Sequence, residues 1–337
     1  MRRLSSVIVH GFALAVIFGS CVVPCGAHEP RASDFEVFAA GLDGPEGLAF
    51  TADGALVVGS VVGDVKRLGP DGAEEILATI DDSIAGVTVL ADGRILAASI
   101  GGDRVWVISP DGDAAVFAEG IGGPNFVVQT IQEGRILVSA STAGAIVDIT
   151  RGRPEVVIPD LEFPNGLAIR QTHGVRYLYV ALTLASEVVR FPMNDDGSFG
   201  EMEPYASGVL LADGLAFDRS GNLLVVGGGQ LNVVRPGGAV ATLSDDPLIN
   251  WASNLAFGQG PGFPTREVYL ANFGPNFGDG TDIVKFRYNH RGSPLASEGL
   301  APSVEGCSFA SRLRTRSPLR GGAIECPARR VRRLSVR

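Results

Sequence analysis

Residues 45–72 read PEGLAFTADGALVVGSVVGDVKRLGPDG, and the stretch from Ala85 to Gly112 reads AGVTVLADGRILAASIGGDRVWVISPDG. Each begins with a short apolar run, passes through an Asp-Gly pair, and continues with two more runs rich in Val, Ile and Leu. Short apolar runs separated by turn residues predict β-strands. The two stretches therefore predict one repeated unit that contains three strands.

Further copies of this unit begin at Pro124, Pro164, Ala212 and Ser253. The period is roughly 40 residues, which is typical of β-propellers. Most copies are followed by a fourth strand, but the sixth copy is not; FEVFAAG, at residues 35–41, precedes the first copy instead. Pairing of this segment with the last copy would close a ring and remove its open edges. The sequence predicts an all-β, six-bladed β-propeller closed by an N-terminal strand. The alternatives are an open β-sandwich or two smaller β domains, which six regular copies and a spare strand disfavour.

The two ends of the chain differ from the repeats. Residues 1–27 combine Arg2 and Arg3 with a long apolar run and a small-residue site at Cys25-Gly26-Ala27, which predicts a cleaved signal peptide. A membrane anchor, or a lipoprotein attached at Cys21, is the alternative. We expect residues 28–290 to form the propeller and residues 291–337, an Arg-rich tail, to be disordered. The prediction is an exported protein, periplasmic or extracellular, with no membrane span after cleavage and an unassigned oligomeric state.

Charge is distributed unevenly along the chain. Residues 291–337 contain ten Arg and three Glu, a net +7, whereas residues 28–290 carry −18 of a whole-chain −9. An acidic domain disfavours nucleic-acid binding and attracts cations.

The candidate site residues all occupy one position of the repeat, just before the innermost strand, where equivalent positions converge on the axis of a propeller. They are Glu46, Ala85, Asn125, Asn165, Asp213 and Asn254. Carboxylate and amide oxygens are the ligands that hard divalent cations prefer. We therefore predict that Glu46, Asn125, Asn165 and Asp213 bind a divalent metal, Ca²⁺ in the first place and Mn²⁺, Mg²⁺ or Zn²⁺ as alternatives. The competing interpretation is that these Glu-Gly, Asn-Gly and Asp-Gly pairs simply form turns, as we expect for Asp53-Gly54, Asp71-Gly72, Asp92-Gly93 and Asp111-Gly112.

Histidine offers little to a catalytic site. His10 lies in the leader, His28 at the expected new N-terminus, His173 in a loop and His290 at the domain end. A His-dependent zinc site and a Ser-His-Asp triad are therefore disfavoured, and no phosphate-binding or dinucleotide-binding fingerprint is present.

At these residues the chain resembles the family of senescence marker protein-30, gluconolactonase and luciferin-regenerating enzyme, which are calcium-dependent six-bladed propellers. Glu46 in PEGLAF, Asn125 in GPNFV, Asn165 in FPNGLAI and Asp213 in LADGLAFD match the positions of the family's metal ligands. The resemblance covers roughly residues 35–290. It implies a lactonase-like hydrolase in which the metal acts as a Lewis acid, Asp213 is the catalytic residue that accepts a proton, and Asn254 is an added ligand or a neighbour of the ligand set.

The chain also departs from this family. Sugar lactonases carry polar substrate contacts near the second and third blades, where this chain has Ala85-Gly86-Val87 and Phe126-Val127. We therefore expect a small-molecule lactone or ester that is less polar than a sugar lactone. The alternative is a non-catalytic binding or scaffold propeller of the NHL type with a structural metal, because a fold alone does not specify a function.

Overall fold

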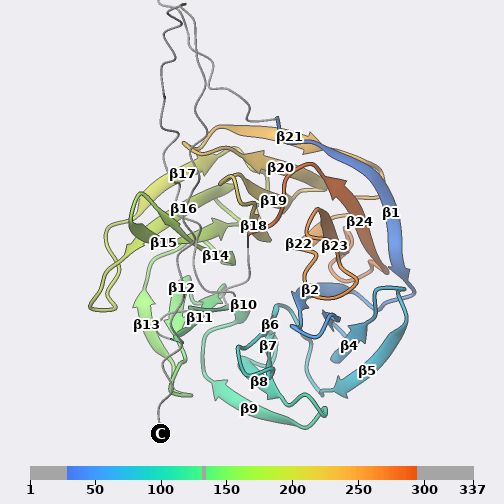
Figure 1. The fold of residues 1–337 in the computed structure, drawn as a ribbon. Coiled ribbons are helices and arrows are strands. Elements are labelled where there is room, and N and C mark those ends of the chain that lie inside the picture. The colour runs from blue at the N-terminus through green and yellow to red at the C-terminus, as the bar shows by residue number, and fades with distance from the viewer. Residues whose placement is uncertain (1–28, 131–133, 294–337) are drawn as a thin grey trace, which may run out of the picture. The chain divides into compact units, whose positions relative to one another are not determined.

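The computed structural model describes residues 29–130 and 134–293. Within these ranges the chain forms strands and connecting loops and no helix, and the strands make six four-stranded antiparallel sheets arranged in a ring (Figure 1). The predicted all-β, six-bladed β-propeller is confirmed. The predicted signal peptide lies outside the described residues, as does the predicted tail from residue 294 onward.

The first three blades each take four consecutive strands. Blade 1 contains β2 (Pro45–Phe50), β3 (Leu56–Ser60), β4 (Asp64–Leu68) and β5 (Glu74–Thr79). Blade 2 contains β6 (Val87–Val89), β7 (Ile95–Ser99), β8 (Arg104–Ile108) and β9 (Ala114–Glu119). Blade 3 contains β10 (Pro124–Gln129), β11 (Ile136–Ala140), β12 (Ala145–Asp148) and β13 (Glu155–Ile158).

The remaining blades follow the same order except at the end. Blade 4 contains β14 (Pro164–Thr172), β15 (Val175–Leu182), β16 (Glu187–Met193) and β17 (Glu203–Ser207). Blade 5 contains β18 (Leu215–Phe217), β19 (Leu223–Gly227), β20 (Gln230–Val234) and β21 (Val240–Ser244). Blade 6 contains β22 (Ala252–Phe257), β23 (Glu267–Asn272), β24 (Asp282–Tyr288) and, as its outer strand, β1 (Ala32–Ala40).

The ring is closed by β1. This strand pairs antiparallel with β24, from Ala32 opposite Tyr288 to Ala40 opposite Asp282, so the predicted closure by an N-terminal strand is confirmed. Hydrogen bonding continues past the predicted domain boundary at residue 290: the Arg219 N–H donates to the Arg291 carbonyl at 2.9 Å, and the Ser293 N–H donates to the Phe217 carbonyl at 2.9 Å. Residues 291–293 are therefore held against blade 5.

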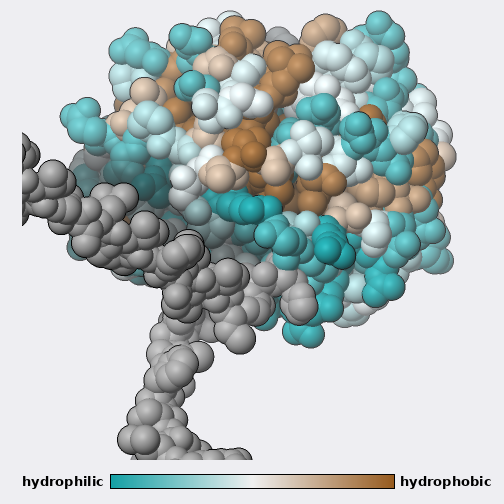
Figure 2. Space-filling view, turned by 90° about the horizontal axis from the view of Figure 1, so that it is seen from above, coloured by the Kyte–Doolittle hydropathy of each residue, from teal (hydrophilic) through white to brown (hydrophobic). Residues whose placement is uncertain are grey.

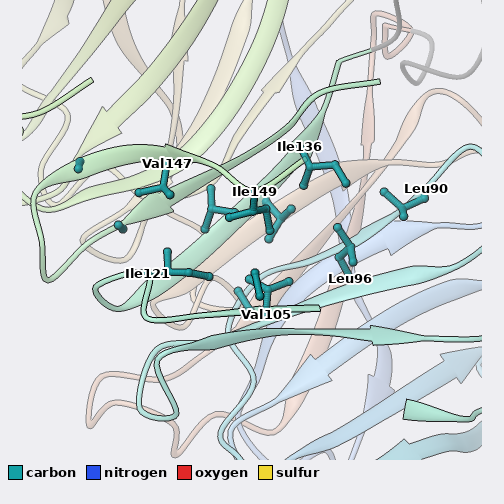
Figure 3. Packing of buried hydrophobic residues seen from close by; sticks show 13 residues of the cluster. Leu90, Leu96, Val105, Ile121, Ile136, Val147 and Ile149 are labelled. Atoms are coloured by element: carbon teal, nitrogen blue, oxygen red, sulfur yellow. The ribbon is translucent and has the colours of Figure 1, made fainter. Parts of the chain in front are cut away.

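The core lies between neighbouring blades. Every residue of β3, β7, β11 and β19 is buried, because both faces of a second strand are covered by adjacent sheets. Figure 3 shows one such layer, in which Leu96 and Val105 of blade 2 face Ile136 and Val147 of blade 3. Each fully buried side chain of this kind contributes roughly 1.5–3 kcal/mol.

The outer strands are less buried. On the face seen in Figure 2, hydrophobic residues lie in small groups between hydrophilic ones.

Hairpins of blades 1 and 2 use glycine for its left-handed backbone. Gly54, Gly72, Gly93 and Gly112 have φ angles of 89°, 79°, 87° and 93°, as predicted for the four Asp-Gly turns. Gly54 and Gly93 connect the first strand to the second, and Gly72 and Gly112 connect the third to the fourth.

Candidate metal centre

The predicted site residues all lie at the start of innermost strands. Glu46, Asn125 and Asn165 are the second residues of β2, β10 and β14. Asn254 is the third residue of β22, and Asp213 lies two residues before β18. In Figure 1 these strands form the inner circle of the ring. The rotational symmetry of the blades thus turns residues far apart in sequence toward one end of the axis.

Contacts between consecutive blades join these positions into a circle. The Gly86 N–H donates to the Asn125 carbonyl at 2.8 Å, and the Gly214 N–H donates to the Ser253 carbonyl at 2.9 Å. The Ser253 hydroxyl donates to the Glu46 carbonyl at 3.2 Å, which connects the last blade to the first.

Between blades 3 and 4, the Ser141 hydroxyl donates to the Pro164 carbonyl at 2.6 Å. Between blades 4 and 5, the Thr183 hydroxyl donates to the Ala212 carbonyl at 2.8 Å. The candidate residues are therefore held by hydrogen bonds between neighbouring blades.

Glycines that follow the candidate residues allow this close approach. A Cβ atom at Gly47 would lie 2.5 Å from the Ala85 carbonyl oxygen, and one at Gly166 would lie 2.1 Å from the Asp213 carbonyl oxygen. A Cβ atom at Gly214 would lie 2.7 Å from the Asn254 Cα. These three glycines do not adopt the left-handed φ of the Asp-Gly turns. The Glu46-Gly47, Asn165-Gly166 and Asp213-Gly214 pairs are therefore packing devices rather than turns, which the competing interpretation of the sequence did not anticipate.

The two carboxyl groups repel each other. Burial raises the pKa of Glu46 to about 8. Burial and the neighbouring charge of Glu46 together raise the pKa of Asp213 well above its usual range. No Lys, Arg or His within residues 29–130 and 134–293 forms an ion pair with either group. The pair thus carries up to two negative charges with no ion-pair partner in the part of the chain that the structure describes.

The two inner asparagines are buried and offer amide oxygens. Asn125 and Asn165 are each 5% exposed. The Asn165 Nδ2 donates to the Thr183 hydroxyl at 3.3 Å, which leaves its Oδ1 free of that contact. Two carboxylates and two neutral amide oxygens around an axis are the donor set that a hard divalent cation prefers, so the residues present fit such an ion.

Asn254 has a different contact pattern. Its Oδ1 accepts the Leu255 N–H at 2.7 Å, and its buried Nδ2 has no hydrogen-bond partner among the described residues. The free group is a donor, which a cation does not bind. Of the two roles that the resemblance implied for Asn254, this arrangement favours a neighbour of the ligand set over an added ligand.

The central channel continues below these positions as an apolar cavity of about 570 Å³. Its walls come from all six innermost strands and include Val87, Phe126 and Asn254. Glu46, Asn125, Asn165 and Asp213 do not line it. The candidate metal centre therefore lies at the mouth, and the cavity lies toward the opposite end of the axis.

A Ser-His-Asp cluster that sequence reasoning missed lies where the β18–β19 turn of blade 5 meets the residues that follow β24 of blade 6. The Ser220 hydroxyl is 3.0 Å from the His290 Nδ1, and the fully buried Asp218 Oδ2 is 3.6 Å from the same nitrogen. A catalytic triad needs the serine and the carboxylate on opposite ring nitrogens. The cluster therefore does not have the geometry of a nucleophile relay. Among the described residues there is also no group of three or more His, Cys, Asp or Glu side chains placed to hold a metal. The predicted ligand set contains only two such side chains, because its other two members are asparagines.

Comparison with known proteins tests the resemblance that the sequence suggested. Residues 125–268 match the model of the SMP-30/Gluconolactonase/LRE-like region, and residues 33–68 match that of the strictosidine synthase-like N-terminal region. The chain carries an SMP-30/gluconolactonase/LRE-like region. The resemblance predicted from the sequence is confirmed. No curated protein sequence matches the chain significantly.

Solved structures with an SMP-30/gluconolactonase-like propeller share the fold. A gluconolactonase from Xanthomonas campestris is 20% identical, with a TM-score of 0.62 over 79% of this chain and 97% of that one. Regucalcin, a calcium-binding protein from Agrobacterium tumefaciens, is 17% identical, with a TM-score of 0.59 over 77% and 98%. A luciferin-regenerating enzyme is 14% identical, with a TM-score of 0.60 over 76% and 95%. At these identities the likeness establishes the propeller fold.

Proposed function

We propose that this SMP-30/gluconolactonase-like propeller is a metal-dependent hydrolase of lactone or ester substrates. The observation that carries the proposal is the pair Glu46 and Asp213 at the starts of innermost strands: burial raises the pKa of both carboxyl groups, the charge of Glu46 raises that of Asp213 further, and no Lys, Arg or His of residues 29–130 and 134–293 forms an ion pair with either. Keeping such a pair is unfavourable for the fold alone, so a ligand of opposite charge explains it.

The metal would be held by Glu46, Asn125, Asn165 and Asp213, with Ca²⁺ as the first candidate because all four donors are oxygens. When bound, a divalent cation supplies Lewis-acid polarisation of a carbonyl and lowers the pKa of water. The amide oxygens of Asn125 and Asn165 add no charge, so the four side chains balance a 2+ ion.

The chain's own groups supply the remaining chemistry. A carboxylate oxygen of Asp213 accepts a proton from the attacking water and returns it to the alkoxide oxygen that is released when the ester C–O bond breaks. The Nδ2 of Asn254 donates a hydrogen bond to an oxygen of the substrate, which satisfies its otherwise unpartnered N–H. Glu46 contributes the second carboxyl group of the donor set.

The test is a panel of lactones and aryl esters assayed with Ca²⁺, Mn²⁺, Mg²⁺, Zn²⁺ or chelator. We expect hydrolysis that requires a divalent metal and that falls about 10³-fold in Asp213→Asn, since a general base contributes roughly 10²–10⁴. Asp43→Asn, an exposed acidic residue near Glu46 in sequence, is the matched control and should retain activity. A protein that binds metal through Glu46 but hydrolyses nothing on the panel would instead be a non-catalytic propeller with a structural metal.

We further propose that the protein acts outside the cytoplasm, as periplasmic or extracellular enzymes do, because residues 1–27 have the pattern of a signal peptide. Among the described residues there is no helix of the length and hydropathy needed to cross a bilayer. Cell fractionation followed by N-terminal sequencing checks this proposal, and an intact Met1 in the cytoplasmic fraction would contradict it.

A further inference from the structure

Large apolar side chains are exposed around the mouth of the propeller. We call five of them the apolar collar: Val62, Leu184, Leu210, Trp251 and Phe277. Their exposed fractions are 56%, 69%, 56%, 40% and 85%. Phe277 and Leu184 are the most exposed large apolar residues of the described chain.

The strand register places the collar at the same end of the axis as the candidate metal centre. Val62 follows Ser60, which pairs with Pro45 beside Glu46. Leu184 follows Leu182, which pairs with Pro164 beside Asn165.

The other three collar residues are placed by their own loops. Leu210 and Trp251 each stand three residues before a candidate site residue, Asp213 and Asn254. Phe277 lies in the loop between β23 and β24, whose ends pair as Asn272 with Asp282.

Neighbouring collar loops are in contact. A Cβ at Gly228 would lie 2.9 Å from the Leu210 Cγ, and one at Gly229 would lie 3.8 Å from the Trp251 ring. The Gly274 N–H donates to the Asn250 carbonyl at 3.2 Å, which joins the Trp251 loop to the Phe277 loop.

The contacts continue into the first blade. A Cβ at Gly278 would lie 3.1 Å from the Val61 side chain. The collar residues on blades 5, 6 and 1 therefore lie along one connected rim.

The backbone presents these side chains at a cost. Trp251 and Phe277 of the collar have φ angles of 51° and 57°, and Leu211, which follows the collar residue Leu210, has a φ angle of 48°. All three lie in the left-handed region that bulky residues rarely adopt. Strained non-glycine residues of this kind gather where function requires a particular presentation. Exposed valines elsewhere, such as Val116 and Val156, lie singly on outer strands and need no such explanation.

The charge of the same end restricts what the collar can bind. The loops between blades and those between second and third strands are all described, and they contain neither Lys nor Arg. They do contain exposed acidic residues: Asp43, Asp81, Asp160, Glu162, Asp245 and Asp279. An acidic rim repels anionic ligands and anionic lipid surfaces. The occupant should be uncharged and partly apolar.

We propose that the apolar collar binds the hydrocarbon group of an uncharged lactone or ester whose carbonyl lies at the mouth. This inference rests on the proposed hydrolase function and names its substrate class. Polar sugar lactones gain nothing from the collar, and phosphorylated substrates are repelled by the rim.

The first experiment uses a homologous series of γ-lactones, from γ-butyrolactone to γ-decalactone, with Ca²⁺-loaded protein. Each methylene removed from water lowers the barrier to kcat/KM, up to about fourfold per CH₂. We expect kcat/KM to rise two- to fourfold per carbon. The ratio of γ-decalactone to γ-butyrolactone hydrolysis should collapse in the triple variant L184S/L210S/F277S.

A matched control replaces exposed apolar residues at the opposite end of the axis. Val175, 40% exposed, lies in the β14–β15 hairpin, and Met202, 51% exposed, precedes β17. The V175S/M202S variant should keep the wild-type ratio. A ratio that does not depend on chain length in the wild-type protein, or that falls equally in both variants, overturns the inference.

A binding measurement separates this inference from the hydrolase proposal. The chain has two Trp residues, Trp106 and Trp251, so a Trp106→Phe protein reports the collar through Trp251 fluorescence. The ligands are 2-alkylcyclopentanones, which keep the ring carbonyl but have no ester bond to break. We expect Kd to fall with alkyl length. Chain-length-dependent binding without hydrolysis of any lactone would refute the hydrolase and leave the collar supported, whereas hydrolysis without chain-length-dependent binding would refute the collar alone.

Discussion

Replacing Glu46 with glutamine should change the stability of the protein in opposite directions with and without metal. In the metal-free protein, Glu46 must ionise near Asp213 without an ion-pair partner among residues 29–130 and 134–293. Its pKa is 4.5 in an unperturbed chain and about 8 in the fold. At 1.36 kcal/mol for each pKa unit, ionisation above pH 8 costs the folded state about 5 kcal/mol. That value is an upper limit because Glu46 remains partly exposed. We expect Glu46→Gln to raise the free energy of unfolding of the metal-free protein at this pH by about 2–3 kcal/mol.

The pH dependence follows from the direction of the shift. Because the folded-state pKa lies above the unfolded value, the folded protein binds the extra proton between pH 4.5 and about 8. The stability of the metal-free protein therefore falls as the pH rises through this window. Glu46→Gln should remove this contribution and flatten the profile.

Thermal unfolding in EDTA and in excess Ca²⁺ provides the assay. In EDTA at pH 8.5 the Tm of Glu46→Gln should exceed that of wild type by about 5–10 °C. In Ca²⁺ the order should reverse, because saturation at about 1,000 times Kd stabilises the wild type by ~4 kcal/mol and the variant lacks one ligand.

The exposed Glu119→Gln serves as the control and should match wild type in both conditions. Equal Tm values for Glu46→Gln and wild type in EDTA, or an unchanged response to Ca²⁺, would refute the assignment of Glu46 to the metal.

Three further predictions concern the framework of the site. Gly166→Ala should destabilise the protein by about 1–3 kcal/mol and weaken Ca²⁺ binding in calorimetry, because its Cβ would lie 2.1 Å from the Asp213 carbonyl oxygen. Gly101→Ala, whose Cβ would have no atom within 4 Å, should be neutral. Equal effects of the two substitutions would contradict the packing role of Gly166. Tyr288→Phe removes the donor that lies 3.1 Å from the buried Asp218 carboxylate and should cost about 1.5–3 kcal/mol in urea unfolding; an unchanged midpoint would show that the contact is not stabilising. Deleting β1 exposes the edge of β24, so the shortened chain should aggregate in size-exclusion chromatography, and a stable monomer would argue against closure by this strand.

The sequence determined the fold because its information is periodic. Apolar runs, Asp-Gly turns and one spare strand recur at a regular spacing, and each blade needs only its neighbours to bury its faces. The same periodicity placed Glu46, Asn125, Asn165 and Asp213 at one phase of the repeat. Positions equivalent in a closed ring converge on one axis, so the sequence by itself predicts a common location for these four residues.

Only the tertiary structure decided the details that depend on contacts between blades. The glycines after the site residues looked like turn glycines in the sequence, and their role as contact points appeared only when the Asp213 carbonyl was found beside Gly166. The orientation of the Asn254 amide and the approach of Ser220 to His290 likewise depend on side-chain packing. The apolar collar could not be predicted from the position of its residues within the repeat, because these residues lie in loops of different length. Periodicity specifies which strand ends meet, whereas loop conformation and side-chain direction are set by atoms that the repeat does not encode.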